Sequence, residues 1–414
     1  MRRTLSLVLS VAVLCILVAC GSDDPTPDEP AEAAVKTDVG VDFDKKVLKI
    51  GALNDVSGPA AAIGKPYALG KQVLVAQVNA GGSGLLPDGW TIELVEKDHG
   101  YNPQQSVQSF KEIKGDVLFV ATSFGTPNTL PLLPMLEEEG MVAFPASLSS
   151  QMAANAHTPP AAAAYTLEAA RAMDWVVEQA GGADTIKAGI VYQQDDYGQD
   201  GIDGWKDAAA RHGVTIVAEQ TIAPGQKDFT AVISALKDAG ATHVLLTTLP
   251  SATGPILGTA AQLKYMPVWI GNTPAWVDKF FEPSVIPSAV FGNFYWATSL
   301  PIWGDEGDGM ALFISGWEAH AGEARYPDFY TMVSWVQGRV ALEAFSRALD
   351  KGDVTRAGYL SALQGLDGYD ADGMIQPLSY TSLPYVAGTK VRILKPDFEA
   401  FTWSEAAPYA EPAK

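Results

Sequence analysis

From Val47 onward, short apolar runs alternate with longer amphipathic segments. The short runs, such as VLKIGAL, TIELVEKD and VLFVATS, predict strands, and segments such as ALGKQVLVAQVNA between them predict helices. The alternation continues through MVAFPAS, IKAGIVYQQ, VTIVAEQ, THVLLTTL and PVWIGN. It is typical of parallel sheets with crossover helices, so the chain is predicted to have an α/β fold. Several apolar runs end in small or polar residues, and open α/β sheets bind ligands at the carboxyl ends of their strands.

The pattern changes after Pro283. The run AVFGNFYWATSL predicts a long aromatic strand, and FYTMVSWVQGRVALEAFSRALD predicts a long helix. The closing segments, GYDADGMIQPLSY and TKVRILKPDFEAFTW, predict antiparallel strands joined by turns. No repeat of twenty to fifty residues is visible, so a solenoid is not predicted.

The N-terminal segment has its own pattern. Arg2 and Arg3 precede the apolar run LSLVLSVAVLCILVA, which ends in LVACGSDD. A charged start, a short apolar middle and a small-residue exit are typical of a secretory signal, and the run is too short to span a bilayer comfortably. The segment also resembles a bacterial lipoprotein signal, which implies cleavage before Cys20 and lipidation of that cysteine. The alternative is an ordinary signal with a chance cysteine. Residues 21–46 are rich in Pro, Asp, Glu and Ala, which predicts a flexible tether.

Length, charge and cysteine content narrow the class of protein. A chain of 414 residues exceeds the roughly 250 to 300 residues at which single cores stop growing, so two lobes are expected. A net charge of -20 argues against nucleic acid and anionic membrane surfaces as partners. The two cysteines, Cys15 and Cys20, both lie in the leader, so the body is predicted to have no disulfide and no thiol chemistry.

Several stretches resemble phosphate-, dinucleotide- or calcium-binding motifs but lack the residues that these sites need. The stretch LNDVSGPAAAIG carries Gly58 and Gly64 but lacks both the Gly-Lys-Ser/Thr of a phosphate loop and a dinucleotide fingerprint. Without these motifs, the stretch predicts only a turn followed by a helix, and the free N–H groups at the start of that helix can face a polar or anionic ligand. The acidic loops WGDEGDG and DGYDADG do not have the spacing of a calcium loop, and turns are the expected role of their Asp-Gly pairs.

No catalytic set or metal site is visible in the sequence. G-x-S-x-G and H-E-x-x-H are absent, and the five histidines are scattered without the spacing of metal ligands. No enzyme, metal or cofactor is therefore predicted. Ten tryptophans are many for this chain, and Trp276 and Trp296 stand near predicted strand ends. Core packing and ligand contact remain equal alternatives for these two residues.

The order of segments resembles a known family. The residues that carry the resemblance are KIGALNDVSGPAAAIGKPYALGKQVLVAQVNAGG, ELVEKDHGYNPQQSV, VLFVATSFGTPNTLPLLPMLEEEGMVAFPAS and IKAGIVYQQDDYGQDGIDGWKDAAARHGVTIVAEQTIAPGQKDFTAVISALKDAGATHVLL. They are similar to type I periplasmic solute-binding proteins of ABC importers, specifically the branched-chain amino-acid and amide receptors. The resemblance runs from about Val47 to near the C-terminus.

The resemblance implies two doubly wound α/β lobes, joined by three crossovers, that close on a ligand by hinge motion. Lobe 1 is expected to comprise residues 47–164 and 299–375, and lobe 2 residues 165–298 and 376–414. The ligand-holding positions implied in lobe 1 are Phe124, Gly125 and Thr126 in TSFGTP, and Ala146, Ser147 and Leu148 in PASLS. Those in or near lobe 2 are Tyr197, Leu249 and Thr273, to which the strand-end Trp276 is added.

Two of these positions depart from the family pattern. Amino-acid receptors usually place an acidic residue at the position of Thr273, and a tyrosine is common at that of Leu249. A threonine cannot neutralise a buried ammonium group, whose burial unpaired is costly. If the alignment shifts by a residue or two, Asp195, Asp196 or Asp278 supplies the charge. As aligned, the site is predicted to suit a neutral, aromatic or singly anionic solute better than a zwitterion.

The function expected from these features is that of a lipid-anchored extracytoplasmic receptor. It captures a small organic solute and presents it to the transmembrane subunits of an ABC permease, with no bond made or broken, no nucleic acid bound, and membrane contact only through the lipid. A ligand sensor for a membrane signalling partner is the main alternative, and a secreted enzyme is a second. A cytoplasmic transcription factor is disfavoured because the N-terminus is a signal and not a DNA-binding helix pair.

Overall fold

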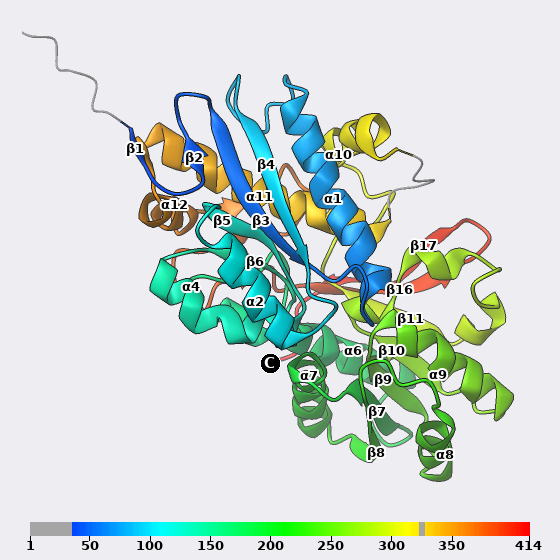
Figure 1. Ribbon diagram of the computed structural model, residues 1–414. Coiled ribbons are helices and arrows are strands. Elements are labelled where there is room, and N and C mark those ends of the chain that lie inside the picture. Colours follow the sequence, from blue (N-terminus) through cyan, green and yellow to red (C-terminus); the bar gives the residue numbers. More distant parts are fainter. Residues whose placement is uncertain (1–34, 323–327) are drawn as a thin grey trace, which may run out of the picture. The chain divides into compact units, whose positions relative to one another are not determined.

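Two sheets organise the part of the chain that the structure describes. The structure is a computed structural model, and it describes residues 35–322 and 328–414. The predicted signal, Cys20 and residues 21–34 of the predicted tether lie outside this part. Residues Val35–Lys414 belong to one compact unit, in which helices cover the faces of both sheets (Figure 1).

The first sheet has five strands. Its strands are β2 (Val41–Asp42), β3 (Val47–Asn54), β4 (Thr91–Asp98), β5 (Phe119–Phe124) and β6 (Ala143–Ala146). β3 pairs in parallel with β4 and β5, and β5 pairs in parallel with β6. Every residue of β5 is buried, as expected for an apolar strand inside a parallel sheet covered on both faces.

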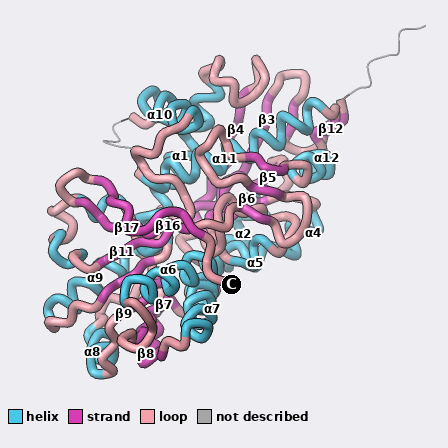
Figure 2. Tube along the Cα trace, turned by 180° about the vertical axis from the view of Figure 1, so that it is seen from behind, coloured by secondary structure: helices cyan, strands magenta, loops and turns pink. Residues whose placement is uncertain are grey.

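The second sheet has seven strands in the order β17-β16-β11-β10-β9-β7-β8. Their bounds are β7 (Lys187–Gln193), β8 (Thr215–Ile222), β9 (His243–Thr247), β10 (Val268–Gly271), β11 (Phe294–Thr298), β16 (Val391–Asp397) and β17 (Thr402–Ala410). Strands β7 to β11 run parallel, and the predicted antiparallel strands β16 and β17 join them beside β11 (Figure 2).

Helices follow the strands as the periodicity predicts. Those associated with the first sheet are α1 (Ala61–Asn79), α2 (Pro103–Ile113), α3 (Thr126–Thr129), η1 (Leu130–Leu132), α4 (Leu133–Glu139), α5 (Ser150–Ala153), α10 (Asp308–His320), α11 (Phe329–Asp350) and α12 (Arg356–Leu363). Those associated with the second are α6 (Tyr165–Ala180), α7 (Asp196–His212), α8 (Thr230–Asp238), α9 (Pro250–Gln262), η2 (Thr273–Ala275), η3 (Asp278–Phe281) and η4 (Ser288–Phe291). Within the described ranges, none of the helices has the length and apolarity needed to cross a membrane.

The chain passes three times between the two sheets, as the predicted three-crossover hinge requires. It leaves the first sheet after β6, returns after β11, and enters the second sheet again at β16. Before that last passage it forms a small sheet of β13 (Asp367–Tyr369), β14 (Leu378–Ser379) and β15 (Val386–Ala387). These strand pairs delay the return to the second sheet until Val391, whereas the last segment of lobe 2 is predicted from the sequence to begin at residue 376.

The end of the predicted tether is already folded. β1 (Lys36–Thr37) pairs with β12 (Asp353–Val354), and β2 pairs with β3. The ring of Phe43 contacts that of Trp90, with 5.9 Å between centroids. The prediction of a tether rested on the average composition of residues 21–46, although the end of this segment contains β-branched and aromatic residues. The predicted tether therefore extends too far toward the C-terminus, because it includes β1 and β2.

The glycine-bearing turn before α1 is closed by a carboxylate. Asp55 is fully buried; its Oδ1 accepts a hydrogen bond from the Gly58 amide at 2.6 Å, and its Oδ2 accepts one from the Ala60 amide at 2.9 Å. A β-carbon at Gly64 would lie 1.7 Å from the Asp55 carbonyl oxygen. The glycine therefore permits close packing. Asp55 binds the N–H groups of Gly58 and Ala60, which precede α1, and the first N–H groups of α1 donate to the backbone carbonyls of Gly58 and Ala60.

Candidate functional site

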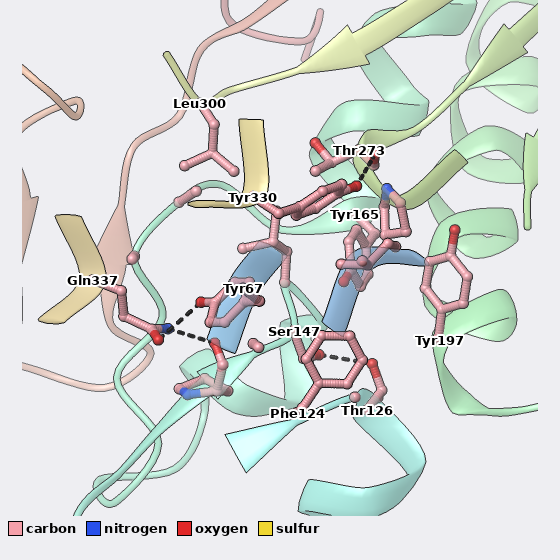
Figure 3. Close-up of a pocket in the computed structure, with 18 of the residues that line it drawn as sticks. Tyr67, Phe124, Thr126, Ser147, Tyr165, Tyr197, Thr273, Leu300, Tyr330 and Gln337 are labelled. Carbon is pink, nitrogen blue, oxygen red and sulfur yellow. Dashed lines mark hydrogen bonds between the residues drawn. The ribbon is translucent and has the colours of Figure 1, made fainter. Parts of the chain in front are cut away.

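A cavity of about 60 Å³ lies where strands of both sheets end. We call it the site cavity (Figure 3). β5, β6 and the helix α3 contribute its first wall, the starts of α7, α9 and η2 contribute its second, and α1, α6 and α11 complete it. Nine of the ten ligand-binding residues predicted from the sequence line this cavity, namely Phe124, Gly125, Thr126, Ala146, Ser147, Leu148, Tyr197, Leu249 and Thr273. Ile63, from the glycine-bearing stretch, lines it as well.

Aromatic side chains dominate the wall of the site cavity. Its tyrosines are Tyr67, Tyr101, Tyr165, Tyr197 and Tyr330. The rings of Tyr165 and Tyr197 meet edge to face at 5.0 Å, and those of Tyr67 and Phe124 at 5.9 Å. Burial raises the pKa of all five hydroxyls well above the ordinary value, so the tyrosines are neutral at physiological pH.

Four of these tyrosine hydroxyls donate to protein acceptors, and one of them, that of Tyr101, donates to Asp195 Oδ2 at 3.4 Å. Tyr67 donates to Gln337 Oε1 at 2.9 Å and Tyr330 to the Thr273 carbonyl at 2.8 Å (Figure 3). Tyr197 donates to Asn272 Oδ1 at 2.8 Å. The hydrogen bonds fix the orientation of the rings. The aromatic wall therefore offers a ligand a rigid apolar surface.

The polar part of the first wall is a pair of hydroxyls. Thr126 Oγ1 and Ser147 Oγ lie 2.7 Å apart, and both residues are buried. Gly125 precedes Thr126 with a φ of 87°, and a β-carbon there would lie 2.7 Å from Asn128 Nδ2. Only glycine suits this turn, which brings Thr126 beside Ser147. One proton is shared between the two hydroxyls, and Ser147 Oγ also accepts from the Ser149 amide at 3.2 Å.

Behind the opposite wall, Thr273 is bound to a buried carboxylate that the sequence patterns did not reveal. Glu168 Oε2 accepts from the Thr273 amide at 2.9 Å, and Oε1 lies 2.5 Å from Thr273 Oγ1. Glu168 is completely buried, and burial raises its pKa to about 8. The group is therefore mostly protonated at neutral pH. The sequence does contain one sign of this group, because Glu168 is a charged residue on the apolar, buried face of the helix TLEAARAMDWVVEQA.

The three aspartates considered as alternative charges do not line the site cavity. Asp195 caps α7 and accepts from Tyr101 OH at 3.4 Å, while Asp196 is exposed. Asp278 accepts from Trp276 Nε1 at 3.0 Å and lies on a different cavity. Among the described residues, no Asp, Glu, Lys, Arg or His side chain lines the site cavity.

Trp276 is part of the core and does not line the site cavity. It is fully buried, and its ring lies 4.5 Å from that of Trp403 and 4.9 Å from that of Phe281. The 3-10 turn η2 carries the chain past the strand end, so residue 276 meets the aromatic core. Trp296 is also buried and donates from Nε1 to the Thr273 carbonyl at 3.1 Å. Of the two alternatives left open for these tryptophans, packing is the correct one.

Comparison with known proteins agrees with this architecture. A profile of the family described as periplasmic binding protein matches residues 47–385. The chain belongs to that family. Its members are solute-binding receptors, and the predicted α/β fold of two doubly wound lobes is confirmed.

Relatives with described functions match only part of this periplasmic binding protein. A Leu/Ile/Val-binding protein homolog from Brucella melitensis is 27% identical over 47% of this chain and 52% of its own length. The chain thus spans about half the length of the curated relatives that it matches.

Solved structures match over most of the chain. A fatty acid ABC transporter substrate-binding protein from Thermomonospora curvata superposes with a TM-score of 0.83 at 22% identity, covering 91% of this chain and 95% of its own. A branched-chain amino acid ABC transporter protein from Thermus thermophilus, with bound valine, gives 0.79 at 18% identity over 89% and 97%. At these identities the likeness establishes the fold.

Proposed function

We propose that the protein is the extracytoplasmic substrate-binding component of an ABC transporter and that it captures a small organic solute in the site cavity. The observation that carries this proposal is the position of the cavity, between the carboxyl ends of strands from two sheets, with an aromatic wall and a hydroxyl pair. Membership of a receptor family supports it. No bond is made or broken in this role, so the protein is a receptor and not an enzyme.

Capture proceeds by closure of the two lobes around the solute. Hydrogen bonds already cross the cleft: Ser251 Oγ donates to the Pro59 carbonyl at 3.0 Å, and Tyr101 OH bonds to Asp195. A ligand that contacts both walls binds the closed form more tightly than the open form and so shifts the population toward it. The closed form is the one that the permease subunits recognise.

The chemistry of the wall favours a neutral, aromatic or singly anionic solute. The hydroxyls of Thr126 and Ser147 suit a carboxylate or amide oxygen, and the tyrosine rings suit an apolar body. An ammonium group finds no charged side chain on the described wall. Glu168 reaches the cavity only through Thr273. The similar proteins named for branched-chain amino acids and for fatty acids have a carboxylate group in common as the ligand head, which supports a carboxylate at the hydroxyl pair.

The N-terminal segment supports a proposal about where in the cell the protein is located. The run that ends in LVAC supports export, cleavage before Cys20 and anchoring by lipid at the outer face of a membrane. The permease subunits are then within reach of the tethered receptor. Radiolabelled palmitate incorporation into the wild-type chain and not into Cys20→Ser tests the anchor.

Native mass spectrometry of the purified protein, followed by thermal-shift screening, tests the solute class. Amino acids, amides, aromatic acids, short carboxylates and polyols form the panel. A ligand at about 100 times its Kd stabilises the folded state by about 2.7 kcal/mol, which gives a clear shift in Tm. We expect selective stabilisation by carboxylates or amides without an ammonium group. Strong stabilisation by leucine or valine would contradict the class inferred from Thr273, and turnover of a bound ligand would contradict the receptor role.

A deletion strain separates transport from sensing. Loss of uptake of the identified solute is expected for the transport receptor. Normal uptake with loss of a ligand-induced response would indicate the sensor alternative.

A further inference from the structure

A second cavity, of about 120 Å³, adjoins the site cavity. Leu148 and Ala162 line both cavities. The side chain of Leu148 and the methyl group of Ala162 therefore form the partition between them. We call this space the rear cavity.

The partition is made of small side chains on a fixed backbone. Residues 161–164 are four consecutive alanines in the passage from β6 to α6, and none has an atom beyond Cβ. The Ala163 amide donates to Ser299 Oγ at 3.1 Å, and the Tyr165 amide donates to the Leu148 carbonyl at 2.9 Å. With the backbone held in this way, passage from one cavity to the other requires a change in the rotamer of Leu148.

The rear cavity offers mainly apolar contacts. Leu167, Val386 and Ala387 contribute aliphatic groups to its wall. Its hydroxyl groups already have protein partners: Tyr385 OH donates to the Ala156 carbonyl at 2.9 Å, and Thr389 Oγ1 donates to a Glu411 carboxylate oxygen at 2.9 Å. No charged side chain of the described residues lines it. Val386 and Thr389 are exposed, so the cavity is open to solvent on their side.

The polar and apolar parts of the two cavities are adjacent in sequence. Ser147 holds one end of the hydroxyl pair, and Leu148, the next residue, forms the partition. A carboxylate or amide bound at the hydroxyls of Thr126 and Ser147 therefore lies beside the partition that Leu148 and Ala162 form.

We propose that the rear cavity is a subsite for the aliphatic tail of the solute and that Leu148 is its gate. The ligand class is a straight-chain carboxylic acid or its amide, whose head group binds at Thr126 and Ser147 and whose chain passes Leu148. This inference rests on the proposed function and adds the substrate class to it.

Calorimetric titration with saturated carboxylates of about four to ten carbons tests the subsite. Each methylene group buried in an apolar cavity is expected to lower Kd about fourfold, until the rear cavity is filled and the affinity levels off. A Kd independent of chain length, or one that rises with it, would overturn the proposal.

Two variants fill the rear cavity. Val386 is 45% exposed, so Val386→Trp tolerates the larger ring, and Val285→Trp, at a valine that is 44% exposed and outside both cavities, is the matched control. Ala163→Leu fills the cavity from the opposite wall. Val386→Trp is expected to raise the Kd of the longest acid at least tenfold and that of the shortest less than twofold.

The outcomes separate this inference from the proposed function. If short carboxylates or other small solutes bind but the rear-cavity variants leave the affinity of long acids unchanged, the subsite is wrong and the receptor role stands. If no solute of any length binds or stabilises the protein, the receptor role itself fails. If Val285→Trp weakens the long acids as much as Val386→Trp, the effect is not local and the subsite is also wrong.

Discussion

Glu168 and Thr273 act as one hydrogen-bonded unit behind the cavity wall. A carboxyl group with no exposed surface keeps its charge only when partners compensate for the loss of water, and the amide and hydroxyl of Thr273 are neutral partners. The pKa of Glu168 rises from its ordinary value of 4.5 to about 8 because of burial. Thr273 Oγ1 lies 2.5 Å from Glu168 Oε1 and 2.9 Å from Thr298 Oγ1, so the threonine hydroxyl links the carboxyl group to a second hydroxyl.

Glu168→Gln tests this protonation state. The pKa of Glu168 is higher in the folded than in the unfolded protein. The stability that this group contributes to the wild type is therefore fully present below about pH 4.5 and is lost as the pH rises toward 8. Glutamine imitates the protonated form and does not titrate. We expect the variant to gain stability relative to the wild type over this range, by up to about 5 kcal/mol at its upper end. Urea unfolding at several pH values measures the difference, and a constant difference across the range would contradict the assignment.

Lys71 is a buried basic group, as Glu168 is a buried acidic one. Its side chain is fully buried in α1, and Nζ donates to the Ser334 carbonyl at 2.9 Å. Burial lowers its pKa from 10.5 to about 7. The cost of burying the charge is therefore fully present below pH 7 and is lost as the pH rises toward 10.5.

Lys71→Met is expected to stabilise the protein below pH 7 by about 1 to 4 kcal/mol, because a buried uncompensated cation is replaced by an apolar side chain of similar length. The gain should shrink toward pH 10. Lys65→Met, at an exposed position of the same helix, is the control and should change little. Equal effects of the two variants would show that burial is not the cause. Thermal unfolding at pH 6 and pH 10 measures both.

At the scale of elements, the turn between β3 and α1 depends on the contact of Gly64 with Asp55. A β-carbon at Gly64 would overlap the Asp55 carbonyl oxygen, so Gly64→Ala must displace either the turn or the helix. We expect a loss of about 2 to 4 kcal/mol in the free energy of unfolding. Gly115→Ala, where nothing lies within 4 Å of the new β-carbon, is the matched control. Chemical denaturation measures both, and a Gly64→Ala variant as stable as the wild type would contradict the close approach.

At the scale of the whole molecule, solute affinity depends on how readily the cleft closes. Ser251 donates across it to Pro59 and does not line the site cavity. Ser251→Ala removes a hydrogen bond of the closed form, which contributes about 0.5 to 1.5 kcal/mol. The Kd of the most stabilising solute of the screen is expected to rise about two- to tenfold, because a smaller fraction of the protein is competent to bind. Ser284→Ala, at an exposed serine, is the control, and equal Kd values for all three proteins would exclude this role of the hydrogen bond.

The sequence by itself determined the strands, most helices and the residues at the strand ends. Period-2 and period-3.6 patterns are local, and parallel strands bring their carboxyl ends to one edge. That Thr126, Ser147 and Leu249 belong to one ligand site was implied by the resemblance to the receptor family, and all three residues line the site cavity.

Only the tertiary structure decided which side chains complete the site. Tyr67 and Gln337 come from α1 and α11, and they meet across 270 residues because these two helices pack together. Glu168 binds Thr273 across 105 residues, and Trp276 turns into the core after η2. Contacts over such separations depend on helix packing and on the path of a turn, which no local pattern in the chain specifies.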